Sequence, residues 1–72
     1  MKYFTIEIKT VNGETTAQLL ERADRTAAIS AYYSIMAAAV ATPGCTQAYT
    51  EVKNSAGGVE ISGIWNAVEA VL

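Results

Sequence analysis

The acidic residues are the first candidates for chemistry, because the chain contains no histidine. Histidine is the commonest general base and the commonest transition-metal ligand, so its absence excludes most hydrolase triads. Acid–base catalysis would then require a buried carboxylate. Alternation along the predicted strands turns only Glu21 toward the core, where we expect a rim residue paired with Arg25 or Lys2. Three other carboxylates are predicted on the outer face of a sheet: Glu7, Glu51 and Glu60.

The single cysteine, Cys45, is predicted to be a small apolar core residue. No basic residue stands close to it in the sequence to activate it as a thiolate. With one cysteine no disulfide can form within the chain, and a reducing cytoplasm is the simplest location. The five glycines do not have the spacing of a phosphate-binding loop. We therefore expect no catalytic site, no metal and no cofactor.

The charge pattern argues against nucleic acid and membrane as partners. Five basic residues stand against seven acidic ones, a net charge of −2, and the basic residues are scattered. A nucleic-acid surface is basic and clustered. The longest apolar run, Ile35 to Ala41, is far shorter than the ~20 residues of a membrane span, and the first residues lack a signal-peptide core. The expected location is the cytoplasm.

The strongest helical period runs from Asp24 to Ala41. Asp24 is suited to cap the first free backbone N–H groups, and Pro43 and Gly44 end the run. Apolar residues recur at spacings of three and four and predict a buried stripe, widened by Ile35 and Ala39. Its members are Ile29, Tyr32, Tyr33, Met36 and Val40.

The other side of this helix is formed by small uncharged residues, where a helix on one sheet normally shows charges to water. Ser30, Ser34, Ala37 and Ala41 follow one another at spacings of four, three and four. This small-residue strip is either a tolerated solvent face of good helix formers or a surface covered by another subunit.

A β-hairpin is predicted before the helix. Alternation marks one strand over Lys2 to Val11, and Asn12-Gly13 is the typical two-residue turn. That turn pairs Val11 with Glu14 and predicts a second strand over Glu14 to Arg22. Five apolar residues then face the helix: Phe4, Ile6, Ile8, Ala17 and Leu19. The alternative is a continuous helix from Glu14, since this stretch is rich in helix formers.

A second hairpin is predicted after the helix. Its first strand runs from Cys45 to Lys53, and a four-residue loop, residues 54–57, pairs Val52 with Val59 and Lys53 with Gly58. This register places Glu51 opposite Glu60, a mildly unfavourable pair. Residues 66–72 are apolar and too short for a stable helix alone, so they need a docking site. The predicted helix-facing residues are Thr46, Ala48, Thr50, Val52, Val59, Ile61, Gly63 and Trp65.

These elements predict an α+β fold for the single domain 1–72, a two-layer ββαββ arrangement with one helix packed across a four-stranded, mostly antiparallel sheet. The strand order 2-1-3-4 fits best. A sheet with one helix leaves its other face open, and that face is either solvated or used for binding. Residues predicted there are Tyr3, Leu20, Tyr49 and Ile64, and two further candidates for binding are Tyr33 and Trp65.

The chain also resembles a group of natural proteins in layout. Thr15-Thr16-Ala17-Gln18 in the second strand, Asp24 before an alanine-rich helix that contains Tyr32, and Trp65 in the last strand are similar to short uncharacterised proteins of Firmicute bacteria and their prophages. The resemblance implies a cytoplasmic bacterial or phage accessory protein and no known activity.

The sequence therefore favours a non-enzymatic binding or inhibitory protein that occupies a partner's surface, and a host protein is a candidate partner. We also expect a homodimer, because low charge, the small-residue strip and an apolar C-terminal segment all indicate hidden surface. The small-residue strip is favoured over the open sheet face as the interface. The alternative function is a small-ligand module with a pocket between subunits, where Tyr33, Tyr49 or Trp65 stacks on the ligand.

Overall fold

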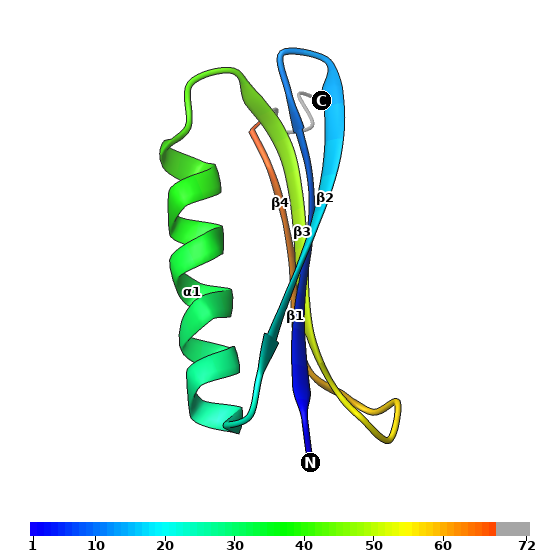
Figure 1. The fold of residues 1–72 in the computed structure, drawn as a ribbon. Helices are drawn as coiled ribbons and strands as arrows, with labels where there is room; N and C mark the ends of the chain where they lie inside the picture. Colours follow the sequence, from blue (N-terminus) through cyan, green and yellow to red (C-terminus); the bar gives the residue numbers. More distant parts are fainter. Residues whose placement is uncertain (68–72) are drawn as a thin grey trace.

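The computed structural model describes residues 1–67 and contains one helix and one four-stranded antiparallel sheet. The elements are β1 (Tyr3–Val11), β2 (Glu14–Arg22), α1 (Arg25–Ala41), β3 (Cys45–Asn54) and β4 (Val59–Asn66). Figure 1 shows α1 lying along one side of the sheet. The order β2-β1-β3-β4 confirms the predicted ββαββ fold and strand order. Most of the predicted C-terminal segment, residues 68–72, lies outside the described residues.

The first hairpin has the predicted register. Asn12 and Gly13 have φ angles of 51° and 82°, the left-handed values that a two-residue type I′ turn requires. Phe4 pairs with Glu21, and Val11 pairs with Glu14. The alternative of a helix that begins at Glu14 is therefore wrong.

Hydrogen bonds hold the start of α1 and the turn that follows its end. At its start the Asp24 carboxylate accepts from the backbone N–H groups of Thr26 (3.4 Å) and Ala27 (3.3 Å), as predicted for an N-cap. After its end the backbone N–H of Asn12 donates to the carbonyl of Gly44 at 2.9 Å. The Asn12 side chain also fills the space where a residue larger than Gly44 would place its Cβ. The two turns at this end of the molecule are thereby joined.

The register of the second hairpin differs from the prediction. Lys53 pairs with Val59, and Val52 pairs with Ile61, so Glu60 is an extra residue that forms a bulge in β4. The bulge removes the predicted Glu51–Glu60 pair, because Glu51 now lies opposite Ser62. The cause lies in the loop, where the Asn54 side-chain oxygen accepts from two backbone N–H groups, those of Ala56 and Gly58, each at 3.0 Å. These bonds tighten the loop and shift the strand that follows.

The face that α1 presents to the sheet includes much of the predicted stripe, since Ile29, Tyr32, Met36 and Ala39 pack in the core, but it is rotated away from the rest. Ala28 and Ala39 are fully buried and Tyr32 nearly so, whereas the predicted stripe residues Tyr33 and Val40 are 60% and 51% exposed. An alanine-rich helix offers more than one apolar stripe, and the smallest side chains allow the closest approach to a sheet. The hydroxyl of Thr5 accordingly donates to the carbonyl of Ala28 at 2.9 Å.

The predicted core face of β1 is also wrong. Thr5 and Glu7 point toward α1 and are buried, because they pair with Val52 and Thr50 of β3, which α1 covers. Five predicted core residues therefore lie on the opposite face: Phe4, Ile6, Ile8, Ala17 and Leu19. Val59 pairs with Lys53 and is exposed as well. Alternation identified the apolar face of β1 correctly, but α1 covers the other one.

Beneath α1 the core is narrow. One cluster is formed by Ala28, Tyr32 and Val52, with Tyr3, Ile29, Met36 and Ile61 packed against it. The second is formed by Ala39, Cys45 and Ala48, with Val11, Met36 and Trp65 around it. The largest fully buried side chains are only Val52, Thr5 and Thr50. A single chain of this size buries only roughly 60% of its unfolded surface, and here little of that is bulky and apolar.

Candidate functional site

The face of the sheet turned away from α1 carries an unbroken apolar row across all four strands. Ala17 of β2 pairs with Ile8 of β1, Ile8 pairs with Tyr49 of β3, and Tyr49 pairs with Ile64 of β4. Paired residues project to the same side of a sheet. In the next row Leu19 and Ile6 continue the apolar surface. We define the open-face patch as these six residues: Ile6, Ile8, Ala17, Leu19, Tyr49 and Ile64.

Much of the open-face patch is exposed in the single chain. Ile8 is 43% exposed, Leu19 59% and Ile64 60%. In Figure 1 the described part of the chain places no element against this side of the sheet. Contiguous apolar surface of this kind, bounded by polar residues, is typical of interaction sites, whereas apolar residues scattered singly are not.

Polar residues border the open-face patch at both ends of the strands. On one side the row Thr15, Thr10, Gln47 and Asn66 is uncharged, and the two threonine hydroxyls lie 2.9 Å apart. At the other end the row is mixed, with Glu21 and Lys53 on either side of Phe4, and Glu51 lies within the patch as the β3 partner of Ile6. A polar margin around an apolar centre is the usual arrangement of a protein–protein interface.

Within the open face, one hydrogen bond joins the patch to its margin. The Tyr49 hydroxyl donates to Glu51 Oε2 at 3.0 Å, and Lys53 Nζ lies 3.9 Å from the other oxygen of Glu51. The bond to the Glu51 carboxylate, together with desolvation, raises the pKa of Tyr49 above its usual value. Tyr49 is therefore a neutral hydrogen-bond donor at physiological pH, which suits an interface better than a charged group does.

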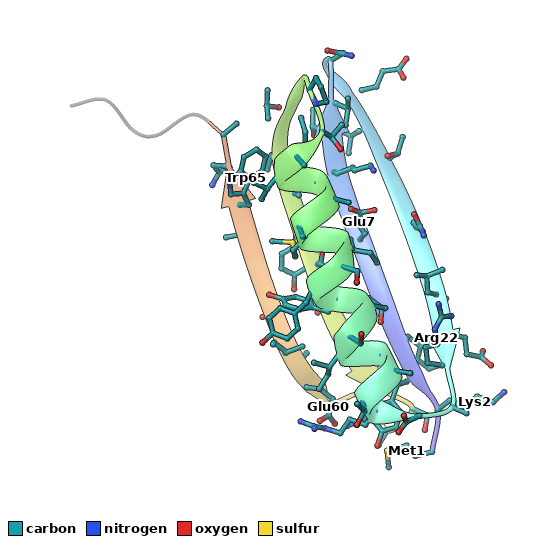
Figure 2. All side chains as sticks on the ribbon, turned by 90° about the vertical axis from the view of Figure 1, so that its left-hand side faces the viewer. Met1, Lys2, Glu7, Arg22, Glu60 and Trp65 are labelled. Atoms are coloured by element: carbon teal, nitrogen blue, oxygen red, sulfur yellow. The ribbon has the colours of Figure 1, made fainter. Side chains whose placement is uncertain are left out.

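The carboxylates are not where the sequence analysis placed them, except for Glu51. Glu7 lies under α1 with its side chain 5% exposed, 3.9 Å from Lys9 Nζ. It appears beside α1 in Figure 2, which views the sheet from the helix side. Glu21 lies on the open face at its edge, exposed, where it pairs with Lys2 at 3.4 Å as one of the two predicted partners. Glu7, the buried carboxylate, is thus the residue that alternation missed.

Glu60 projects from the bulge in β4 toward the start of α1. Arg25 Nε donates to Glu60 Oε1 at 2.8 Å, and Asn54 Nδ2 donates to Glu60 Oε2 at 2.9 Å. These two bonds lower the pKa of Glu60, the Arg25 bond most strongly, and the same pair raises the pKa of Arg25. The arrangement fastens the second hairpin to the helix and is structural in character.

The predicted binding residues do not form one site within a chain. Tyr49 and Ile64 lie in the open-face patch, whereas Tyr3 packs under α1 and Leu20, paired with Thr5, lies on the same side. Trp65 packs against Ala39, Cys45 and Ala48, and Tyr33 is on the outer side of α1. The predicted small-residue strip is exposed along its whole length: Ser30, Ser34, Ala37 and Ala41.

Residues 1–67 contain no detectable pocket and no cluster of acidic or cysteine side chains suited to a metal ion. α1 is not long and apolar enough to cross a membrane. Cys45 is buried, and its thiol lies 3.6 Å from the carbonyl of Gln47, in agreement with the predicted core role.

Comparison with protein-family models, with curated proteins and with solved structures gives no match to this chain. The resemblance to short Firmicute and prophage proteins stays a prediction. The open-face patch is thus the feature from which a function can be argued. Its signal was already present in the alternation of Phe4, Ile6 and Ile8, which the sequence analysis assigned to the helix side.

Proposed function

We propose that this protein is a non-enzymatic binding module that acts by docking the open face of its sheet onto another protein surface. The observation that carries the proposal is the apolar row Ala17, Ile8, Tyr49 and Ile64, which spans the sheet between polar margins. In keeping with the sequence, the module is a cytoplasmic accessory protein of bacterial or phage type.

Two features of the surface support binding over catalysis. The open face is apolar along a row that crosses the sheet, and the carboxylate within the patch, that of Glu51, is already hydrogen-bonded to Tyr49. The buried Glu7 has no histidine to work with anywhere in the chain, and its nearest charged group is Lys9 on the same strand. A surface of this kind recognises another surface rather than a substrate.

The alternative of a ligand pocket between subunits gains no support from the geometry. Tyr33, Tyr49 and Trp65 lie on three different surfaces of the chain, as described above. Each could therefore contribute only to a different pocket, and residues 1–67 contain no pocket beside any of them. We therefore argue for docking through the sheet.

The test uses two exposed alanines as a matched pair, Ala17 in the open-face patch and Ala37 in the small-residue strip. Wild type, Ala17→Glu and Ala37→Glu are each tagged and purified from the cells that naturally make the protein, and the retained proteins are identified by mass spectrometry. We expect the same partner with wild type and Ala37→Glu and its loss with Ala17→Glu, because a charge at Ala17 would be desolvated in the interface.

Circular dichroism of both variants serves as the control for folding. Retention of the partner by a folded Ala17→Glu chain, or the absence of any protein partner, including an untagged copy, would contradict the proposed function. Loss with Ala37→Glu instead of Ala17→Glu would transfer the docking surface to α1.

A further inference from the structure

The open-face patch must be covered by something as wide as a sheet. Its apolar row crosses four strands, so its outer members, Ala17 and Ile64, stand about 14 Å apart at the usual strand spacing. A single helix is about 10–12 Å across with its side chains, and a single added strand is narrower. Laid along the strands, as α1 lies on the other face (Figure 1), either would leave one end of the row in water, whereas a second sheet covers it.

The dimensions of the face agree with this. From the level of Phe4 to that of Thr10, four strands make a flat area of about 450 Å², to which upright side chains add accessible surface. A specific interface buries about 600–1,000 Å² on each partner. Nearly the whole face is then needed for a stable complex, and a partner that covers it wholly matches it in shape.

The narrow core indicates which molecule supplies the sheet that covers the open-face patch. The bulky apolar residues of the first hairpin are on the open face, while Thr5 and Glu7 occupy the helix side. A partner that binds only the folded chain stabilises it by an amount that rises with the partner's concentration. A chain of marginal stability therefore needs a partner that is present at least at the concentration of the chain itself. A second copy meets this condition under all circumstances. We infer that the open-face patch packs against the same patch of a second copy of this chain, in a two-fold dimer.

The charges on the face also select the orientation of the two sheets. If the two-fold axis ran along the strands, β1 would lie over β3 of the other copy, and Ile6 and Phe4 would contact Glu51 and Lys53. If the axis crosses the strands at the level of Glu7, β1 lies over β1 and Ile8 contacts Ile6. Tyr49 then meets Glu51 of the other copy, a donor opposite an acceptor.

The second arrangement is self-complementary. Ile6 and Leu19 of each copy meet Ile8 and Ala17 of its mate. Each Tyr49 reaches a carboxylate, as it already does within its own chain at 3.0 Å. Both arrangements cover Glu51, but the first sets Glu51 and Lys53 against the hydrocarbon of Ile6 and Phe4, which is costly for unpaired charges, whereas the second sets Glu51 against a hydroxyl donor. The dimer therefore has antiparallel β1 strands that cross its axis, and both α1 helices lie on the outside.

This inference rests on the proposed function, and its test begins with the purified chain alone. Sedimentation at micromolar concentration should give twice the chain mass of 7.6 kDa. Ala17→Glu should raise the dissociation constant at least about 100-fold, whereas Ala37→Glu should leave it unchanged. A wild-type monomer overturns the inference; the proposed function then stands only if a different protein is still captured through Ala17.

The orientation is tested in a chain with an intact face, so the result does not depend on whether Ala17→Glu folds. A nitroxide spin label on Glu14→Cys lies on the helix side of the sheet, outside the contact, and the native Cys45 is buried. The crossed arrangement separates the two Glu14 Cα atoms by about 30 Å, and the axis along the strands by about 18 Å. Electron–electron distance measurement should give the longer value; the shorter value, or no coupling, overturns the proposed dimer.

Discussion

The two faces of this sheet have opposite characters, and the side that the helix covers is the more polar one in β1. Under α1 the strand contributes Thr5 and Glu7, whereas the uncovered side carries Phe4, Ile6 and Ile8. Complete burial of an isoleucine or leucine contributes about 1.5–3 kcal/mol. Most of the hydrophobic stabilisation available to the first hairpin is thus obtained only when something covers the open face.

The two faces separate a close approach between elements from the burial of large apolar side chains. α1 approaches the sheet closely because Ala28 and Ala39 are small, and Thr5 bonds directly to the helix backbone. Such contacts specify position but bury little bulk. On the open face no element of the described residues packs against the sheet, but this face carries the large apolar side chains. One face therefore determines the geometry of the chain, and the other carries the apolar surface that the proposed association would bury.

The largest effect on the helix side is expected at Gly63. A Cβ at this position would collide with the Tyr32 hydroxyl, which lies directly over the glycine. Gly63→Ala should lower the free energy of unfolding by about 1–2 kcal/mol, the overpacking cost less the gain of alanine over glycine in a strand. Urea denaturation measures it. Tyr32→Phe in the same chain should restore at least half of the loss, and unchanged stability of Gly63→Ala would show that α1 is not so close.

Two threonines under α1 should respond in opposite directions to the same substitution. Thr5 and Thr50 are both fully buried, but Thr5 donates to Ala28 and the Thr50 hydroxyl has no hydrogen-bond partner among the described residues. Thr5→Val should destabilise the protein by about 1 kcal/mol, and Thr50→Val should stabilise it by about 1 kcal/mol. Each serves as the control for the other in thermal unfolding. A loss at both positions would mean that the Thr50 hydroxyl is bonded.

The open face should be sensitive only while it is covered. Ile64 is 60% exposed in the single chain, so in a monomeric chain Ile64→Thr should change stability by less than about 0.5 kcal/mol. In the dimer the same substitution should lower the free energy of unfolding by about 1 kcal/mol per chain. Unfolding followed at several protein concentrations separates the two cases. An equal, small effect at every concentration would mean that this face stays in water.

The smallest effect concerns the link between α1 and the second hairpin, and it depends on pH. The bonds from Arg25 and Asn54 lower the pKa of Glu60, so the folded state binds this proton less tightly than the unfolded state does. Its stabilisation is present above the ordinary value of 4.5 and is lost as the pH falls through the lower folded value. Glu60→Gln should flatten the fall of stability below about pH 4.5. The exposed Glu14→Gln should not, and equal pH profiles for wild type and Glu60→Gln would contradict the link.

Features that depend on neighbouring residues were predictable from the sequence. Asn12-Gly13 determined the register of the first hairpin, and Asp24 marked the start of α1 because its carboxylate caps the next two free N–H groups. The bulge at Glu60 was not predictable in this way, since it depends on how the Asn54 side chain folds back on its own loop.

The apolar open face could be predicted only in part, for a related reason. Alternation in β1 shows that Phe4, Ile6 and Ile8 need cover, but the pattern is the same whether the cover is the chain's own helix or another molecule. Which face of β1 lies under α1 is determined by β3, where Val52 and Thr50 face α1 and pair with Thr5 and Glu7. That long-range register leaves no local mark in the sequence.

The central position of β1 also bears on how the protein is made. Its neighbour on one side, β2, follows at once through a two-residue turn, but its neighbour on the other side begins only at Cys45. As the chain leaves the ribosome, β1 has an unpaired edge until β3 has followed it. Pairings between distant segments are slow to form and expose strands to aggregation meanwhile. A strand that is interior in the finished sheet is thus an edge strand until β3 has been made, and the two hairpins can join only after that.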